Sequence, residues 1–174
     1  MRLPASSLLL SLSLACTPDA PQDGPCNGDF VATEADFTCS RDWVQVGNLR
    51  ITNRCGQEDV AVDLARNPQE DAQYPLGTMI SLNATEAMVK RGKDFDPTNN
   101  NWEYFNLRLS PSGATITSRG KAEVKNDLGS CLECHAGARR FDFNCRDGHG
   151  CDPLPVTGEQ LKLTQTLDPR CGPF

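Results

Sequence analysis

The residues best suited to chemistry in this sequence are Cys131, Cys134 and His135, which form a C-x-x-C-H pentapeptide. Two thiols three residues apart lie on one turn of a helix, where both can add to the vinyl groups of a haem as thioethers. The adjacent histidine then directs its imidazole at the iron as the proximal ligand. With nine cysteines and two histidines in 174 residues, composition alone would produce this pentapeptide ~0.005 times. We therefore predict one covalently bound haem c, with its iron on His135.

Other interpretations of the two cysteines stay open at this point. A C-x-x-C pair can be a redox dithiol, but that motif belongs to a βαβ unit, and the residues before Cys131 predict none. The pair could also form a structural disulfide or half of a zinc site. A zinc site would need a second pair of ligands, and His149 is the one other histidine in the chain.

The remaining cysteines point to an oxidising compartment. A lipid anchor on Cys16 would account for the odd total of nine. The six left over are predicted to form three disulfides, and they are Cys26, Cys39, Cys55, Cys145, Cys151 and Cys171. Cys145 and Cys151 bracket a glycine-rich loop and could bridge locally, whereas the sequence does not pair the other four.

The N-terminus has the pattern of an export signal. Arg2 precedes a short apolar run to Ala15, which is too short to span a bilayer. The run ends in Leu14-Ala15-Cys16, which is similar to a bacterial lipobox, so residues 1–15 are predicted to be a signal peptide and Cys16 the lipidated residue. Residues 16–40 are predicted to be the anchor and a tether. This places the protein in the periplasm or on the outer membrane, held by lipid alone; soluble secretion is the alternative.

Composition excludes several classes of function. The net charge of -6 and the pI near 4.9 argue against nucleic-acid binding, which depends on Lys/Arg patches. A mean hydropathy of -0.46 excludes a protein with several membrane spans. The length predicts one domain, with the haem domain at residues 41–145 and a cysteine-rich tail packed on it at residues 146–174.

Hydrophobic periodicity predicts a strand-rich domain with short helices. Alternation predicts strands at residues 43–52, 59–64, 77–82, 102–110 and 114–118, the last two joined as a hairpin. A cap and a terminal glycine predict a helix at residues 85–91, with Glu86 and Lys90 as an exposed pair. A C-terminal helix at about residues 128–138 would carry the C-x-x-C-H motif. The chain after Cys151 is predicted to be ordered but irregular, held by Cys171.

Residues 74–143 resemble the cytochrome P-460 family, a strand-rich group that includes the beta-type cytochromes c′. Four segments carry the likeness in order and spacing: YPLGT at 74–78, EAMVK at 86–90, NWEYF at 101–105 and SCLECH at 130–135. The resemblance implies an α+β fold, mainly an antiparallel β-sheet with short helices, which the disulfides would staple. It also implies one haem c, a proximal His135 and an open distal face. Family members oxidise hydroxylamine or bind nitric oxide. The oxidising members carry a lysine cross-linked to the haem, where this chain has Leu82, which favours gas-binding or electron-transfer members.

The distal pocket is predicted to draw on Met79, Leu82, Phe105, Phe143 and Arg50. Met79 or His149 could instead be a sixth iron ligand. The alternative for each of these side chains is an ordinary place in the core or on the surface. Three functions result: a five-coordinate haem protein or oxidoreductase for small nitrogen species, a six-coordinate electron-transfer cytochrome, and a haem-free disulfide-stapled binding lipoprotein. The expected partners are a small gaseous or nitrogenous ligand and a periplasmic redox protein, with a homodimer left open.

Overall fold

The computed structural model describes residues 26–121, 123–127, 129–146, 151 and 153–172. The predictions for the signal peptide, for Cys16 and for His149 therefore lie outside the described residues. No helix within the described ranges is long and apolar enough to cross a membrane.

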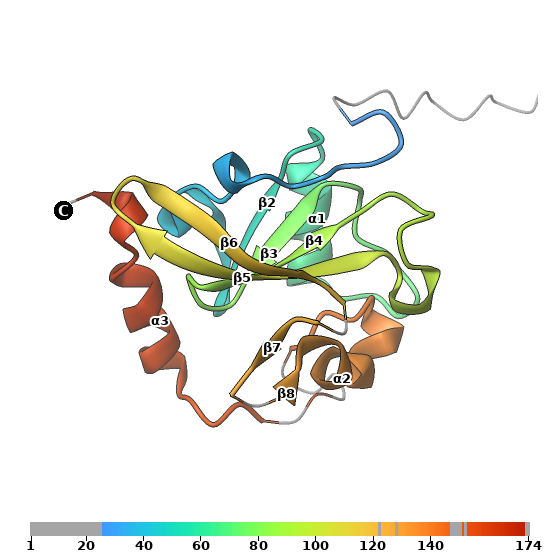
Figure 1. The fold of residues 1–174 in the computed structure, drawn as a ribbon. Coiled ribbons are helices and arrows are strands. Elements are labelled where there is room, and N and C mark those ends of the chain that lie inside the picture. The colour runs from blue at the N-terminus through green and yellow to red at the C-terminus, as the bar shows by residue number, and fades with distance from the viewer. Residues whose placement is uncertain (1–25, 122, 128, 147–150, 152, 173–174) are drawn as a thin grey trace, which may run out of the picture.

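A six-stranded antiparallel sheet forms the centre of the fold, in the order β1-β2-β3-β4-β5-β6 (Figure 1). Each strand pairs with its neighbours along the chain, so the sheet is a simple meander. Its strands are β1 (Val44–Val46), β2 (Leu49–Asn53), β3 (Thr78–Ser81), β4 (Glu86–Lys90), β5 (Trp102–Ser110) and β6 (Gly113–Gly120). A separate small hairpin consists of β7 (Lys125–Asn126) and β8 (Gly129–Ser130). The predicted α+β class with a mainly antiparallel sheet is confirmed.

Two predicted strands and one predicted helix differ from the structure. The strand expected at residues 43–52 is broken into β1 and β2 by a turn at Gly47 and Asn48, where Gly47 adopts a φ of 61°. Residues 85–91, predicted to be helical, contain β4 instead. Because β4 lies between β3 and β5 in the middle of the sheet, Ala87, Met88 and Val89 are all buried, and burial on both faces hides the alternation of a strand.

The helices are α1 (Glu58–Arg66), α2 (Cys131–His135) and α3 (Gly158–Thr166), with short 3-10 helices at Glu34–Asp36, Ser40–Asp42, Pro97–Asn99, Ala136–Phe141 and Pro169–Cys171. α1 replaces the strand predicted at residues 59–64. Its buried residues are Ala61, Val62 and Ala65, the spacing of one helix face, while Val60 is exposed. α3 lies in the tail that was predicted to be irregular, so the motif helix is not the last one.

The sheet carries a separate apolar cluster on each face. On the face that we call the α2 face, Ile51, Ile80, Met88 and Tyr104 lie in register across β2 to β5 and pack with α1 and with Cys131 and Leu132 of α2. On the other, N-terminal face, the cluster contains Phe37 and Trp43 from the N-terminal segment, together with Met79, Val89 and Phe105. The alternation predicted along residues 102–110 is therefore confirmed.

Both ends of the described chain are tied to the sheet. Cys26 is bonded to Cys55, and Cys39 to Cys171. Ala32 and Phe37 are buried in the N-terminal cluster. The folded part therefore begins before residue 41, and the tether predicted to reach residue 40 is too long at its C-terminal end.

Candidate functional site

The β7–β8 hairpin delivers the C-x-x-C-H motif as a single turn of helix, α2, at the lower right of Figure 1. Ser130 is the N-cap, and its hydroxyl accepts a hydrogen bond from the backbone N–H of Glu133. The α-helix is shorter than predicted and continues as the 3-10 helix Ala136–Phe141. The thiols of Cys131 and Cys134 thus stand three residues apart on one helical turn, directly before His135.

The oxidation states of the cysteines single out the motif. The predicted three disulfides are confirmed as Cys26–Cys55, Cys39–Cys171 and Cys145–Cys151. The free cysteines in the described part of the chain are Cys131 and Cys134. The first is partly buried and the second is exposed. Both thiols are therefore available for covalent attachment of a cofactor.

The imidazole of His135 is held in one orientation. Its Nδ1 lies 2.6 Å from the carbonyl oxygen of Phe143, and its ring packs against the Tyr104 ring with centroids 5.2 Å apart. A carbonyl can only accept, so Nδ1 carries the proton and, in the neutral ring, Nε2 keeps a free lone pair. Burial lowers the pKa of His135, although this hydrogen bond and the charge of Glu86 act in the opposite direction. The lowered pKa favours the neutral ring. This is the arrangement of a metal-binding histidine with its second nitrogen fixed by an outer partner.

The electrostatics of the thiols do not match a redox dithiol. Burial first, and then the charges of Glu86 and Cys134, raise the pKa of Cys131 to about 11. Reactive dithiols instead have a thiolate stabilised by a lowered pKa. Cys131 is thus a neutral thiol at physiological pH, and the redox interpretation of the motif loses support.

Tyr104 leaves a polar atom without a partner beside the motif. Its hydroxyl is buried and makes no hydrogen bond within the described residues. Burial is the main cause that raises the pKa of Tyr104, and the negative charge of Asp142 adds to it. Unsatisfied buried hydroxyls are uncommon, and a ligand bound beside the group is one explanation for them. The free thiols, the free Nε2 and this hydroxyl together fit a haem bound at α2.

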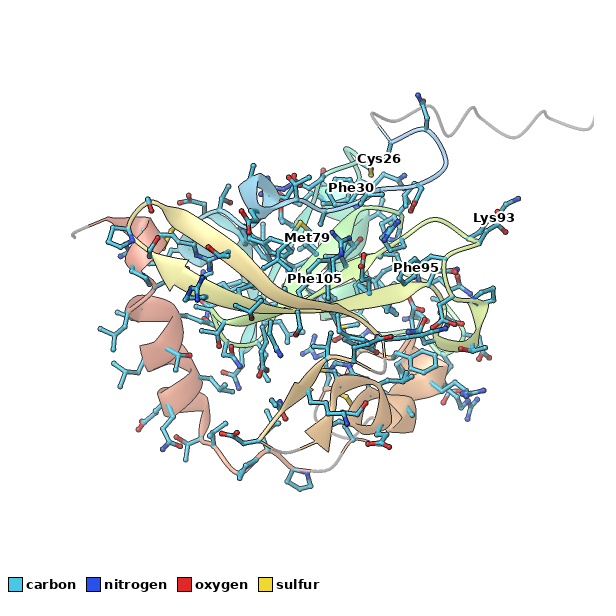
Figure 2. All side chains as sticks on the ribbon, in the orientation of Figure 1. Cys26, Phe30, Met79, Lys93, Phe95 and Phe105 are labelled. Atoms are coloured by element: carbon cyan, nitrogen blue, oxygen red, sulfur yellow. A yellow bond between two sulfur atoms is a disulfide. The ribbon has the colours of Figure 1, made fainter. Side chains whose placement is uncertain are left out.

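The residues predicted for the distal pocket are not brought together. Met79 and Phe105 lie in the cluster on the N-terminal face (Figure 2). His135 packs instead against Tyr104, which belongs to the cluster on the opposite face of the sheet. The structure does not bring the first two side chains to the α2 face, because Met79 alternates with Ile80 along β3 and Phe105 alternates with Tyr104 along β5. Leu82 does pack on the α2 face with Cys131.

Two further residues of that predicted set have other roles. Phe143 meets His135 through its backbone carbonyl on the Nδ1 side, away from the Nε2 that would face an iron. The guanidinium of Arg50 donates from Nε to Gln165 Oε1 at 3.0 Å and from Nη1 to the Trp43 carbonyl at 3.4 Å. Arg50 therefore links β2 to α3 and is not a pocket residue.

Strand β4 directs three side chains toward α2 that the helical interpretation missed. Glu86, Met88 and Lys90 alternate along the strand on the α2 face, with Met88 opposite Tyr104 and Lys90 opposite Trp102. Glu86 accepts hydrogen bonds from Asn83 and Asn126, and Lys90 pairs with Asp142. Neither belongs to an exposed Glu86–Lys90 helix pair, so that prediction is wrong.

An open groove of about 830 Å³ separates α3 from the sheet. Its lining includes Thr85 from the turn before β4, Leu107 and Leu109 from β5, and Leu161 and Thr164 from α3. The side-chain amide of Gln165 fixes the helix in place by donating to the carbonyls of Asn48 and Leu82, at 2.7 and 2.9 Å. The sequence could not indicate this groove, because it forms only once the tail contributes a helix.

No group of three or more His, Cys, Asp or Glu side chains in the described ranges could hold a metal ion by itself. A haem needs no such group, since its porphyrin supplies four of the iron's ligands and the protein adds one imidazole. No protein-family model, no curated protein and no solved structure matches this chain.

Proposed function

We propose that this protein binds one haem c through thioethers to Cys131 and Cys134, with His135 as the axial ligand of the iron. The observation that carries the proposal is the combination on α2 of two free thiols with a histidine whose Nδ1 is engaged by the Phe143 carbonyl. The same turn thus offers two attachment points and one unprotonated ring nitrogen. The three disulfides are in keeping with an exported protein, where haem c is attached.

We infer further that the opposite iron position is open and binds a small nitrogen species such as nitric oxide or hydroxylamine. Bound haem would supply an iron that changes oxidation state and takes up such a ligand. Met79, the methionine predicted as a sixth ligand, lies on the far face of the sheet. No lysine lies between Arg66 and Lys90, and the Nζ of Lys90 is 2.7 Å from Asp142. These features favour a protein similar to the members of the cytochrome P-460 group that have no lysine cross-link. They also favour ligand binding over hydroxylamine oxidation.

A second candidate, a six-coordinate electron-transfer cytochrome, is favoured by one observation. Met88 is buried on the α2 face, opposite Tyr104. A thioether on the same face as His135 could become a sixth ligand and would raise the reduction potential. Its close packing in the α2-face cluster makes a core role the simpler account of Met88.

The test is to express the whole chain with its N-terminal segment in a host that matures haem c. Haem that stays on the denatured chain, and is lost in a variant lacking both Cys131 and Cys134, would support covalent attachment. A high-spin ferrous form that binds CO or NO at once would support the open site. A low-spin ferrous form indifferent to CO would support the electron carrier. A protein without haem would refute both and leave the disulfide-stapled binding lipoprotein.

A further inference from the structure

Asp142 and Phe143, seven and eight residues beyond His135, have a backbone conformation that needs outside support. Their φ angles are 53° and 58°, in the left-handed region that is unfavourable for residues with a Cβ. Such conformations persist where the surrounding structure over-determines them, and they concentrate at functional sites. The contacts of Asp142 supply that support.

The Asp142 carboxylate collects hydrogen bonds from three separate parts of the chain. Lys90 Nζ donates to both oxygens, at 2.8 and 2.7 Å. The backbone N–H of Tyr74 donates at 2.7 Å and the side-chain amide of Asn100 at 2.9 Å. The carbonyl of Asp142 accepts from the indole Nε1 of Trp102 at 2.6 Å. These bonds fix both the side chain and the peptide of Asp142 against the centre of the sheet.

The Lys90–Asp142 pair is fully enclosed, with side chains 5% and 0% exposed. The ammonium group also lies 5.0 Å from the centroid of the Trp102 ring. Replacing a buried ion pair by packed apolar side chains is often neutral or stabilising. Stability alone therefore does not account for a charged pair at this position, whereas a need to hold the neighbouring backbone in one orientation does.

The group whose position this pair would fix is the carbonyl of Phe143, in the peptide that follows Asp142 and Phe143. The carbonyl of Phe143 accepts the hydrogen bond from Nδ1 of His135 at 2.6 Å. Its direction is set by the backbone angles of Asp142 and Phe143, and so by the contacts of Asp142. A strong acceptor on Nδ1 raises the basicity of Nε2 toward a metal. A better donor stabilises ferric over ferrous iron and lowers the reduction potential.

We propose that the buried Lys90–Asp142 pair is a positioning device for the axial histidine, which fixes the Phe143 carbonyl on Nδ1 of His135 and thereby sets the donor strength of Nε2 toward the haem iron. The structure gives neither side chain a hydrogen bond to His135, so both act through the Phe143 carbonyl. The inference rests on the proposed function, since it concerns the iron that His135 would hold.

The experiment uses the full chain matured with haem c, as wild type and as Lys90→Met, Lys90→Arg and Asp142→Asn. Three quantities are measured: haem content, the midpoint potential, and the iron–histidine stretching frequency of the ferrous protein by resonance Raman. Lys90→Met and Asp142→Asn should retain haem, raise the midpoint potential and lower the stretching frequency. Lys90→Arg keeps the charge opposite Asp142 and should stay close to wild type.

Asp168→Asn is the matched control, because Asp168 forms a pair with Arg170 that is equally buried, with side chains 0% and 5% exposed, and bonds to the backbone of Ser40 away from α2. It should lower the melting temperature without moving the potential. Melting changes in Lys90→Met and Asp142→Asn with an unchanged potential and frequency, or an equal shift in the control, would overturn the inference.

Two features keep the test decisive. If Asp142→Asn does not fold, the comparison of Lys90→Met with Lys90→Arg decides by the same measurements. If the ferrous wild type is six-coordinate, the potential alone decides. Failure of the proposed function differs from failure of the inference, because the wild type would then carry no haem. That result would overturn the inference before any variant is compared.

Discussion

Replacing Asp168 by asparagine should remove a large part of the acid-sensitive stability of the C-terminal segment. The Asp168 carboxylate accepts hydrogen bonds from the Ser40 backbone at 2.9 Å and from Arg170 Nε and Nη2 at 2.8 and 2.7 Å. Burial alone would raise the pKa of this carboxyl, but the hydrogen bonds outweigh burial and lower the pKa from 3.8 to about 2. The ionised form is therefore strongly preferred in the folded state.

The magnitude follows from that difference in pKa. A pKa lowered from 3.8 to about 2 corresponds to roughly 2–3 kcal/mol of stability at neutral pH. Because the folded pKa lies below the unfolded one, this contribution is complete above about pH 5 and is lost as the pH falls toward 2. In the variant, Arg170 stays buried with the carbonyls of Phe37 and Ala84 as acceptors. The free energy of unfolding at pH 7 should fall by about 3 kcal/mol.

The assay is urea unfolding of the oxidised protein at a series of pH values between 7 and 2. The wild-type and Asp168→Asn curves should be separated at pH 7 and converge toward pH 2. Asp29→Asn is the control, since hydrogen bonding to Arg91 lowers the pKa of Asp29 to about 2 as well, but its side chain is 42% exposed. Its effect should be smaller and weakened by salt. Parallel curves for wild type and Asp168→Asn across this range would refute the reasoning.

The other expected outcomes concern the cofactor and the backbone. Replacing Cys131 or Cys134 by alanine should leave one thioether, and replacing both should let acid-acetone extract the haem while the non-reduced mass still shows three disulfides. Met88→Leu should leave the ferrous spectrum and its CO response unchanged; loss of a low-spin spectrum would identify a sixth ligand. Gly77→Ala should lower the free energy of unfolding by about 2–4 kcal/mol, because Gly77 has a φ of 77° and a methyl group there would meet the Cys55 side chain. Urea unfolding checks this, and a loss below about 1 kcal/mol would contradict it.

The covalent framework was the most predictable part of the molecule. Counting alone assigned six cysteines to disulfides and left the motif pair free, because thiols in an exported chain pair unless something else uses them. The short bridge between Cys145 and Cys151 was also within reach of the sequence. The bond between Cys39 and Cys171 was not, because it closes a separation of 132 residues that only the docking of the tail determines.

The predictions of secondary structure were wrong where a short segment matched the hydrophobic period of another kind of element. Residues 59–64 alternate apolar and polar like a strand, yet α1 buries Ala61, Val62 and Ala65 on one helical face. Six residues hold fewer than two helical turns, too few for alternation to exclude a helix. At residues 85–91 a strand, β4, was predicted to be a helix. This error was possible because a strand covered on both faces shows no clean alternation.

Because residues 85–91 were predicted to be a helix, the sequence did not indicate that Lys90 and Asp142 could position His135. In a helix, Lys90 would reach back to Glu86 on a solvent-exposed face, and neither side chain would need explanation. In the central strand, Lys90 stands opposite Trp102 and is 4% exposed, and a lysine so buried requires an anion. That anion is Asp142, 52 residues away and one residue before the carbonyl that orients His135. Assigning β4 correctly would thus have predicted a buried carboxylate partner, but only the fold could place that partner beside the motif. The local sequence supplies groups that could hold a cofactor, whereas their orientation depends on a charge pair that only the complete fold brings together.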